Sequence, residues 1–210
     1  MTRTYPPFDL AGLAERLGEP LAPAAAALEA LYADLDQRNQ RLTQGLDLPC
    51  HRGCDACCHE SVFLTPLEFM VAWGYAQAHL SPEAMARVID EGLRLYVVHR
   101  PVIEGLLEPD SGGEAGHDGL AARLKFTCPL LGADGACSVY PARELYARLF
   151  GCSFNSQGGI YGCHEVGRHL ADREVTLVSA PAVAQALSAL PLTFMRQVYP
   201  YYIHALYGDG

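Results

Sequence analysis

"CHRGCDACCHE", residues 50–60, places four cysteines and two histidines within eleven consecutive positions. Three explanations are open for so dense a group of soft ligands: a disulfide framework, a metal or cluster site, and a reactive thiol. Sequence of helical character lies on both sides of this segment. We therefore expect residues 50–60 to form a loop around which a small helical fold is organised.

Length and composition describe an ordinary globular protein. The chain has 210 residues, of which 50% are hydrophobic and 19% are charged, so it is long enough to bury a substantial core in one domain, with or without an appended helical layer. Its formal net charge of -9 argues against a general nucleic-acid binder, because neutralising phosphates requires a basic face.

Apolar runs in the sequence are short. Charged residues interrupt the first 20 positions, so these lack the apolar core of a signal peptide. No run approaches the roughly 20 apolar residues that a transmembrane helix needs. These features predict a cytoplasmic protein with no membrane partner. Thiols are kept reduced in that compartment, which favours metal ligation over disulfides.

Hydrophobic spacing and helix-start signals predict a mainly α fold with little sheet. Apolar residues at helical spacing predict a helix over 23–44, with Gly45 as its stop. A second helix start has the capping-box pattern, with Thr65 as N-cap, Pro66 in the first helical position and Glu68 as the reciprocal partner.

The same signals predict the other elements. These are a helix from "SPEA" at 81–84 toward Pro101 that re-forms to Leu107, a mobile acidic and glycine-rich loop at 108–119, a tight turn at Asp134–Gly135, a helix from Pro141 that Gly151 ends, a loop at 152–165, a short strand in 173–179, and two helices in 181–207 broken near Pro191. We expect one compact unit with an N-terminal helical segment (1–47), a cysteine-cluster metal-binding domain (48–165) and a C-terminal helical segment (166–210).

Two groups of cysteines predict a metal or cluster site. They are C-x3-C-x2-C-C, formed by Cys50, Cys54, Cys57 and Cys58, and C-x8-C, formed by Cys128 and Cys137. Thiolates are strong, soft ligands for zinc, iron–sulfur clusters and Cu(I), and two distant sulfur-bearing loops are a common way to assemble such sites. The spacing indicates metal ligation more strongly than it indicates which metal.

The adjacent pair Cys57–Cys58 leaves two alternatives open. Neighbouring side chains diverge in extended or helical backbone, so one thiol can ligate while the other packs as a small hydrophobe. Alternatively, both serve a larger multi-metal centre. The histidines and glutamates beside cysteines, His51, His59, His164, Glu60 and Glu165, are expected to be solvent-exposed loop residues.

These motifs resemble the YkgJ-type cysteine-cluster family, described as a zinc- or iron-chelating domain. The resemblance covers about residues 48–152 and rests on the leading Cys50 and on Cys54, Cys57, Cys58, Cys128, Pro129, Cys137, Ser138, Tyr140, Arg143 and Arg148. The chain departs from the family pattern at two positions. Glu144 replaces the usual proline, and Ala147 replaces a ligand-type cysteine, so the later Cys152 or Cys163 is expected to substitute.

The resemblance implies a thiolate-ligated metal centre, for which we favour an iron–sulfur cluster over zinc. The expected ligands are Cys50, Cys54, Cys57, Cys58, Cys128, Cys137 and Cys152. Two interpretations remain for Arg143 and Arg148: they donate hydrogen bonds to the centre, or they form surface salt bridges from different faces of one helix.

Three functional hypotheses stay open. The first is a metal-binding protein in which the centre organises the fold. The second is an enzyme that uses the centre for redox or protein-modification chemistry, because a flagellin lysine methylase related to the family carries a similar cluster. The third is an adaptor or metal-handling module without turnover. The sequence identifies no substrate, no catalytic residue and no protein partner.

Overall fold

The structure is a computed structural model that describes residues 4–51, 53–107 and 123–208. Within those ranges the chain forms eight α-helices and one two-stranded sheet, which confirms the mainly α class. The elements are α1 (Leu10–Arg16), α2 (Leu21–Thr43), η1 (Ala56–His59), α3 (Pro66–His79), α4 (Pro82–Gly105), η2 (Tyr140–Ala142), α6 (Leu145–Leu149), β1 (Ser153–Phe154), α7 (His164–Leu170), β2 (Val178–Ser179), α8 (Ala180–Ser188) and α9 (Tyr199–Tyr207). The predicted mobile loop at 108–119 lies outside the described residues.

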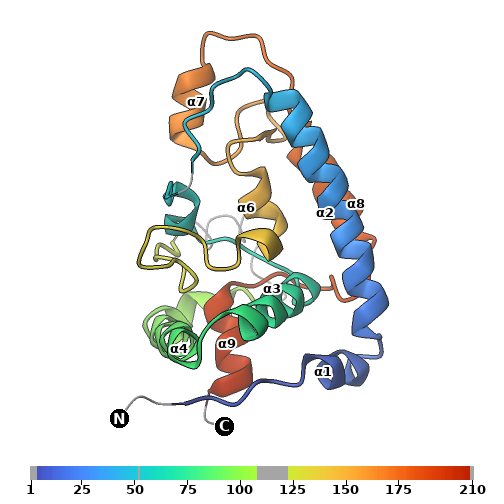
Figure 1. The fold of residues 1–210 in the computed structure, drawn as a ribbon, viewed down its shortest axis with the longest axis vertical. Helices are drawn as coiled ribbons and strands as arrows, with labels where there is room; N and C mark the ends of the chain where they lie inside the picture. Colours follow the sequence, from blue (N-terminus) through green and yellow to red (C-terminus); the bar gives the residue numbers. More distant parts are fainter. Residues whose placement is uncertain (1–3, 52, 108–122, 209–210) are drawn as a thin grey trace.

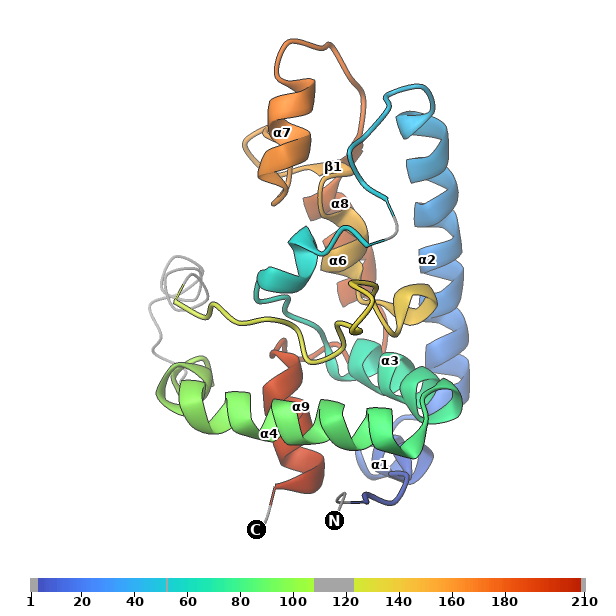
Figure 2. The ribbon, with the colours of Figure 1, turned by 60° about the vertical axis from the view of Figure 1, so that its left-hand side comes forward.

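The helices are arranged around a layer of irregular loops. α2 runs along one side of the molecule beside α8, while α3, α4 and α9 gather at one end and α7 lies at the other (Figure 1). Residues 53–60 and 125–140 lie between these two ends, close to α6 (Figure 2). The cysteine-bearing segments therefore occupy the middle of the molecule.

One large hydrophobic cluster holds the α3–α4–α9 end together. Phe69 is fully buried and stacks on both Trp73, at a centroid distance of 5.4 Å, and Tyr202, at 4.7 Å. Residues from all three predicted segments contribute to this cluster, from Leu10 to Ile203. The N-terminal, middle and C-terminal segments consequently share one core.

The capping box at the start of α3 is confirmed. The Thr65 hydroxyl accepts a hydrogen bond from the Glu68 backbone N–H at 3.3 Å, and the Glu68 carboxylate accepts one from the Thr65 backbone N–H at 2.8 Å. Pro66 occupies the first helical position, where its missing N–H costs nothing.

The predicted interruption of the next helix at Pro101 is wrong, because α4 continues to Gly105. Pro101 lies on an exposed face, where Val97 is 71% exposed, so water can reach the carbonyl that the proline leaves without an N–H partner. The final turn is also held by Glu104, which accepts hydrogen bonds from Tyr96 Oη at 3.0 Å and from Arg100 Nε at 2.8 Å.

The helix predicted from Pro141 to Gly151 is divided into η2 and α6. Arg148 explains the break, because its guanidinium binds the carbonyls of Pro141 at 2.5 Å and Arg143 at 2.8 Å. The Leu145 N–H, which a continuous helix would direct to the Pro141 carbonyl, instead donates to Glu68 Oε1 at 2.8 Å. Hydrogen bonds with side chains therefore replace backbone hydrogen bonds of the expected helix.

After Gly151 the chain forms a very short sheet and the two closing helices. The expected strand in 173–179 is reduced to β2, which pairs in parallel with β1 inside the expected loop 152–165. The two closing helices are confirmed as α8 and α9, and residues 189–198 around Pro191 separate them.

Candidate metal centre

The first cysteine segment is a compact turn followed by a short 3-10 helix. The Cys54 N–H donates to the His51 carbonyl at 3.0 Å, and the Cys58 N–H donates to the Asp55 carbonyl at 2.7 Å. Cys57 and Cys58 both lie in this short helix, where Cys58 is buried and Cys57 is half-buried. The burial of Cys58 is compatible with the alternative in which one of the two thiols packs as a small hydrophobe, and the choice between the two alternatives stays a prediction.

The second cysteine segment is the predicted turn. The Leu131 N–H donates to the Cys128 carbonyl at 3.0 Å, Gly135 has a positive φ of 74°, and Leu131 and Cys137 form an antiparallel bridge. This turn is attached to the first segment by a hydrogen bond of 2.7 Å from the Cys128 N–H to the Cys58 carbonyl. The backbone itself therefore brings the two cysteine segments together.

The third segment brings Cys152 and Cys163 to the same region. Gly151 has a left-handed φ of 75° and its N–H donates to the Tyr161 carbonyl at 2.8 Å, so the chain turns sharply after α6. A Cβ at Gly151 would lie 3.1 Å from the Cβ of Cys163 and 2.9 Å from Cγ2 of Val166. The predicted reversal at Gly151 is confirmed, and it directs Cys152 toward the other cysteines.

Replacing Gly151 by alanine is expected to destabilise the protein through two separable effects. A left-handed conformation costs a non-glycine residue roughly 1–2 kcal/mol, and the new methyl group also crowds Cys163 and Val166. Gly158 is a matched control, because it has a similar φ of 79° and open space around its Cβ position. Urea denaturation should show a larger loss of unfolding free energy for Gly151→Ala than for Gly158→Ala. Equal losses would contradict the crowding.

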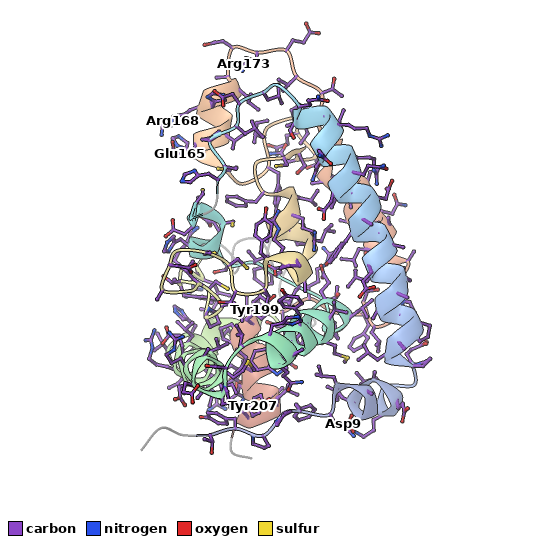
Figure 3. All side chains as sticks on the ribbon, in the orientation of Figure 1. Asp9, Glu165, Arg168, Arg173, Tyr199 and Tyr207 are labelled. Carbon is purple, nitrogen blue, oxygen red and sulfur yellow. The ribbon has the colours of Figure 1, made fainter. Side chains whose placement is uncertain are left out.

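All eight cysteines line one cavity of about 680 Å³, which we call the cysteine cavity. They come from three segments that span residues 50–163, and all eight are free thiols. The other described residues of the wall include Phe126, Leu130, Arg143, Glu144, Ala147 and Tyr199. Figure 3 shows Tyr199 at the inner end of α9, opposite Tyr207. The seven cysteines expected as ligands are thus brought together, and Cys163 joins them.

Burial and mutual repulsion disfavour the ionised thiols. Burial is the main cause that raises the pKa of Cys50 and Cys137, each to about 11, and the pKa values of Cys128 and Cys152 are raised for the same reason. Cys57 is the exception. A hydrogen bond from Cys58 lowers the Cys57 pKa to about 7, and the charge of Arg143 adds to that effect.

Arg143 is the one lysine or arginine among the described residues of the cavity wall. Its guanidinium lies 4.2 Å above the ring of Tyr140, and within the described part of the chain its buried Nε has no hydrogen-bond partner. Its charge lowers the pKa values of Cys57, Cys137 and Cys152. Arg143 thus lies in the wall of the cysteine cavity, and its role as a donor to a metal centre stays a prediction.

Glu144 is a wall residue that the sequence indicated only as a departure from the family pattern. It is buried, it accepts a hydrogen bond of 2.8 Å from Tyr199 Oη, and burial raises its pKa. No spacing rule identifies such a residue, because its position depends on the break between η2 and α6.

Arg148 does not line the cysteine cavity. It is 5% exposed, its guanidinium lies 4.2 Å above the ring of Tyr32, and Nη1 pairs with Asp36 Oδ2 at 2.6 Å. Both interpretations from the sequence are wrong for Arg148. It is neither a donor to the cavity nor a surface residue, because it lies in the interior between α2 and α6. It also does not share a helix with Arg143, which precedes the helix that holds Arg148. Arg148 thus supports the wall of the cysteine cavity from the interior of the protein and does not line it.

The histidines and glutamates beside the cysteines are exposed or half-exposed, as expected. His51, which lines the mouth of the cavity, bonds the Pro49 carbonyl at 2.9 Å, and His59 bonds Asp55 at 3.1 Å. Glu165 pairs with Arg168 on α7, on the outer surface (Figure 3), and Glu60 pairs with Lys125. These contacts satisfy the side chains without a metal.

The cysteine cavity fits a metal centre in donor chemistry rather than in preset geometry. Eight thiols around one cavity are a suitable ligand set for zinc or for an iron–sulfur cluster. Across residues 4–51, 53–107 and 123–208, no three His, Cys, Asp or Glu side chains are already arranged to hold an ion. Binding therefore requires the thiols to turn into the cavity.

Comparisons with known proteins add no relative from which a site could be transferred. No family model, no curated protein and no solved structure matches the chain. Within the described residues, none of the helices has the length and apolar character needed to cross a membrane. The cysteine cavity is therefore the feature of the chain that points to a function.

Proposed function

We propose that the protein binds a thiolate-ligated metal centre in the cysteine cavity, with an iron–sulfur cluster favoured over zinc. One observation carries the proposal: eight thiols from three segments, spread over more than half of the chain, line a single cavity. The ligands are drawn from Cys50, Cys54, Cys57, Cys58, Cys128, Cys137, Cys152 and Cys163.

The electrostatics of the cavity support a bound cation. Buried thiols keep their protons unless a positive charge replaces them, and here each ionised cysteine raises the pKa of its neighbours. A metal centre supplies that charge and takes the place of the protons. Arg143 alone cannot offset several thiolates.

Two features favour a cluster over a single zinc ion. The thiols outnumber the four that a structural zinc site uses, and the cavity volume exceeds the space of one ion. A bound cluster would supply one-electron redox chemistry, whereas zinc would supply only charge and cross-linking.

Anaerobic purification followed by visible spectroscopy and elemental analysis tests the proposal. We expect iron and sulfide in equal amounts, with the thiolate–iron absorption of a cluster. Colourless protein that contains zinc would keep the thiolate centre and replace the favoured metal. Protein that contains no metal, and that binds neither zinc nor a cluster on reconstitution, would refute the proposal.

Substituting Arg143 by lysine is expected to change the centre more than the fold. Lysine keeps the charge but loses the planar group that lies over Tyr140 and that carries the buried Nε. We expect a shifted reduction potential or a weaker metal affinity of about 10-fold to 100-fold, the usual range for ligand-supporting residues. Melting curves of the metal-free protein should move little.

The exposed Arg94, which pairs with Glu91 on α4, provides the matched control for this substitution. Arg94→Lys should leave the spectrum and the metal affinity as they are in the unaltered protein. An Arg143→Lys protein with the unaltered spectrum, potential and affinity would contradict a role of Arg143 at the centre.

A further inference from the structure

The eight thiols of the cysteine cavity divide into two groups of four. The first group is joined by backbone hydrogen bonds. Cys58 and Cys128 are linked by the 2.7 Å bond between their main chains, and Cys137 lies across the same turn from Leu131. Cys57 belongs to this group because it directly precedes Cys58 within η1. We call Cys57, Cys58, Cys128 and Cys137 the turn group.

The turn group lies against the large hydrophobic core. Cys128 and Cys137 both pack against the cluster that contains Leu130, Val139 and Leu145. Cys163 instead belongs to a separate, smaller cluster with Val166, Leu170 and Leu177. Cys128 and Cys137 are therefore anchored in a different hydrophobic cluster from Cys163.

The second group is assembled around Cys163. Cys152 follows Gly151, whose Cβ position lies 3.1 Å from the Cβ of Cys163. Leu46 and Leu48 pack on the Cys163 cluster, and the Leu46 carbonyl is bound by His169 Nε2 at 3.1 Å. The chain therefore reaches Cys50 directly from the Cys163 side.

Cys54 completes this second group. The bond of 3.0 Å from its N–H to the His51 carbonyl turns the chain back toward Cys50. We call Cys50, Cys54, Cys152 and Cys163 the α7 group, since Cys163 is the N-cap of α7.

Arg143 lines the cavity together with both groups, and it is the one lysine or arginine among the described residues of the wall.

We propose that the cysteine cavity holds two metal subsites of four thiolates each, one formed by the turn group and one by the α7 group. This inference rests on the proposed function and extends it from one centre to two. Four thiolates are the complete ligand set of a structural zinc ion and of one iron–sulfur cluster, so each group can bind either. Arg143 lies where its charge offsets the negative charge of both.

Titration of the reduced, metal-free protein with Co²⁺ tests this division, because the optical spectrum of Co²⁺ reports tetrahedral thiolate ligation. We expect saturation at two equivalents, with displacement of both by Zn²⁺. Two paired variants distinguish the subsites: Cys128→Ser with Cys137→Ser, and Cys152→Ser with Cys163→Ser. Each is expected to lose one equivalent and keep the other.

The possible outcomes separate this proposal from the proposed function. Saturation of the unaltered protein at one equivalent, or loss of all Co²⁺ in both paired variants with helical circular dichroism retained, overturns the two subsites and leaves a single centre. Failure of the unaltered protein to bind any metal overturns both proposals. ¹¹³Cd nuclear magnetic resonance of the unaltered protein needs no variant and is expected to show two sulfur-ligated signals; one signal overturns the division.

Discussion

Removing the proposed metal is expected to lower the free energy of unfolding by an amount on the order of 10 kcal/mol, the apparent contribution of a structural thiolate site at neutral pH. The cavity walls explain why the effect should be so large. The three cysteine segments are mostly turns and loops, and few hydrogen bonds join them, such as that between Cys128 and Cys58. Metal–thiolate bonds would be the main links across the cavity.

The loss of stability without metal should be unequal along the chain. Few buried side chains form the cluster beneath α7, whereas the α3–α4–α9 end has the large aromatic core. We expect amide hydrogen exchange in the metal-free protein to accelerate most in α7 and in residues 46–60, and least in α3 and α9.

Thermal denaturation with and without a strong chelator measures this effect. The double variant Cys54→Ala and Cys137→Ala should reproduce the chelated protein, because it removes one thiol from each group. The exposed Ser188→Ala on α8 is a control that should respond to chelator as the unaltered protein does. A metal-free protein with an unchanged melting curve would contradict the structural role of the metal.

Substitution of Glu68 by alanine is expected to be the most damaging single change outside the cavity. Glu68 is 1% exposed and its carboxylate accepts four hydrogen bonds: from Tyr32 Oη at 2.8 Å, from the Leu145 N–H at 2.8 Å, and from the backbone N–H and hydroxyl of Thr65 at 2.8 Å and 3.0 Å. Each donor left buried without a partner costs about 1–3 kcal/mol, so the total should exceed about 3 kcal/mol.

A double-mutant cycle with Tyr32→Phe isolates one of these bonds. The Tyr32 hydroxyl should be worth about 1 kcal/mol or more when Glu68 is present and little or nothing after Glu68→Ala. The exposed Glu91, which pairs with Arg94, gives a matched control in Glu91→Ala, whose effect should be small. A loss below about 1 kcal/mol for Glu68→Ala would show that the network contributes little.

Local signals in the sequence predicted the elements whose causes are local. The capping box of α3, the turn around Gly135 and the chain reversal at Gly151 depend on neighbouring residues, and all three are present. The gathering of the cysteines into one region also follows from their pattern, because separated thiol-bearing loops commonly converge.

The features that were mispredicted depend on partners far along the chain. The helix from Pro141 breaks because Arg148 and Glu68 bind groups that helical bonds would use, and Glu68 lies 77 positions from Leu145. Arg148 lies outside the cavity for the same kind of reason, because its guanidinium contacts Asp36 and Tyr32 on α2. Spacing along the sequence carries no information about such partners.

The division of the cysteines between two sides of the cavity has a consequence for the order of assembly. In the unfolded chain, Cys50, Cys54, Cys57 and Cys58 are the nearest thiols to one another, and closing so short a loop costs little entropy. If the two proposed subsites form, metal that arrives early would be captured by these four, which the proposal assigns to opposite groups. Folding would then have to exchange ligands, a kinetic trap that late metal delivery would avoid. The timing of metal supply would thus select between a productive route and a stalled intermediate.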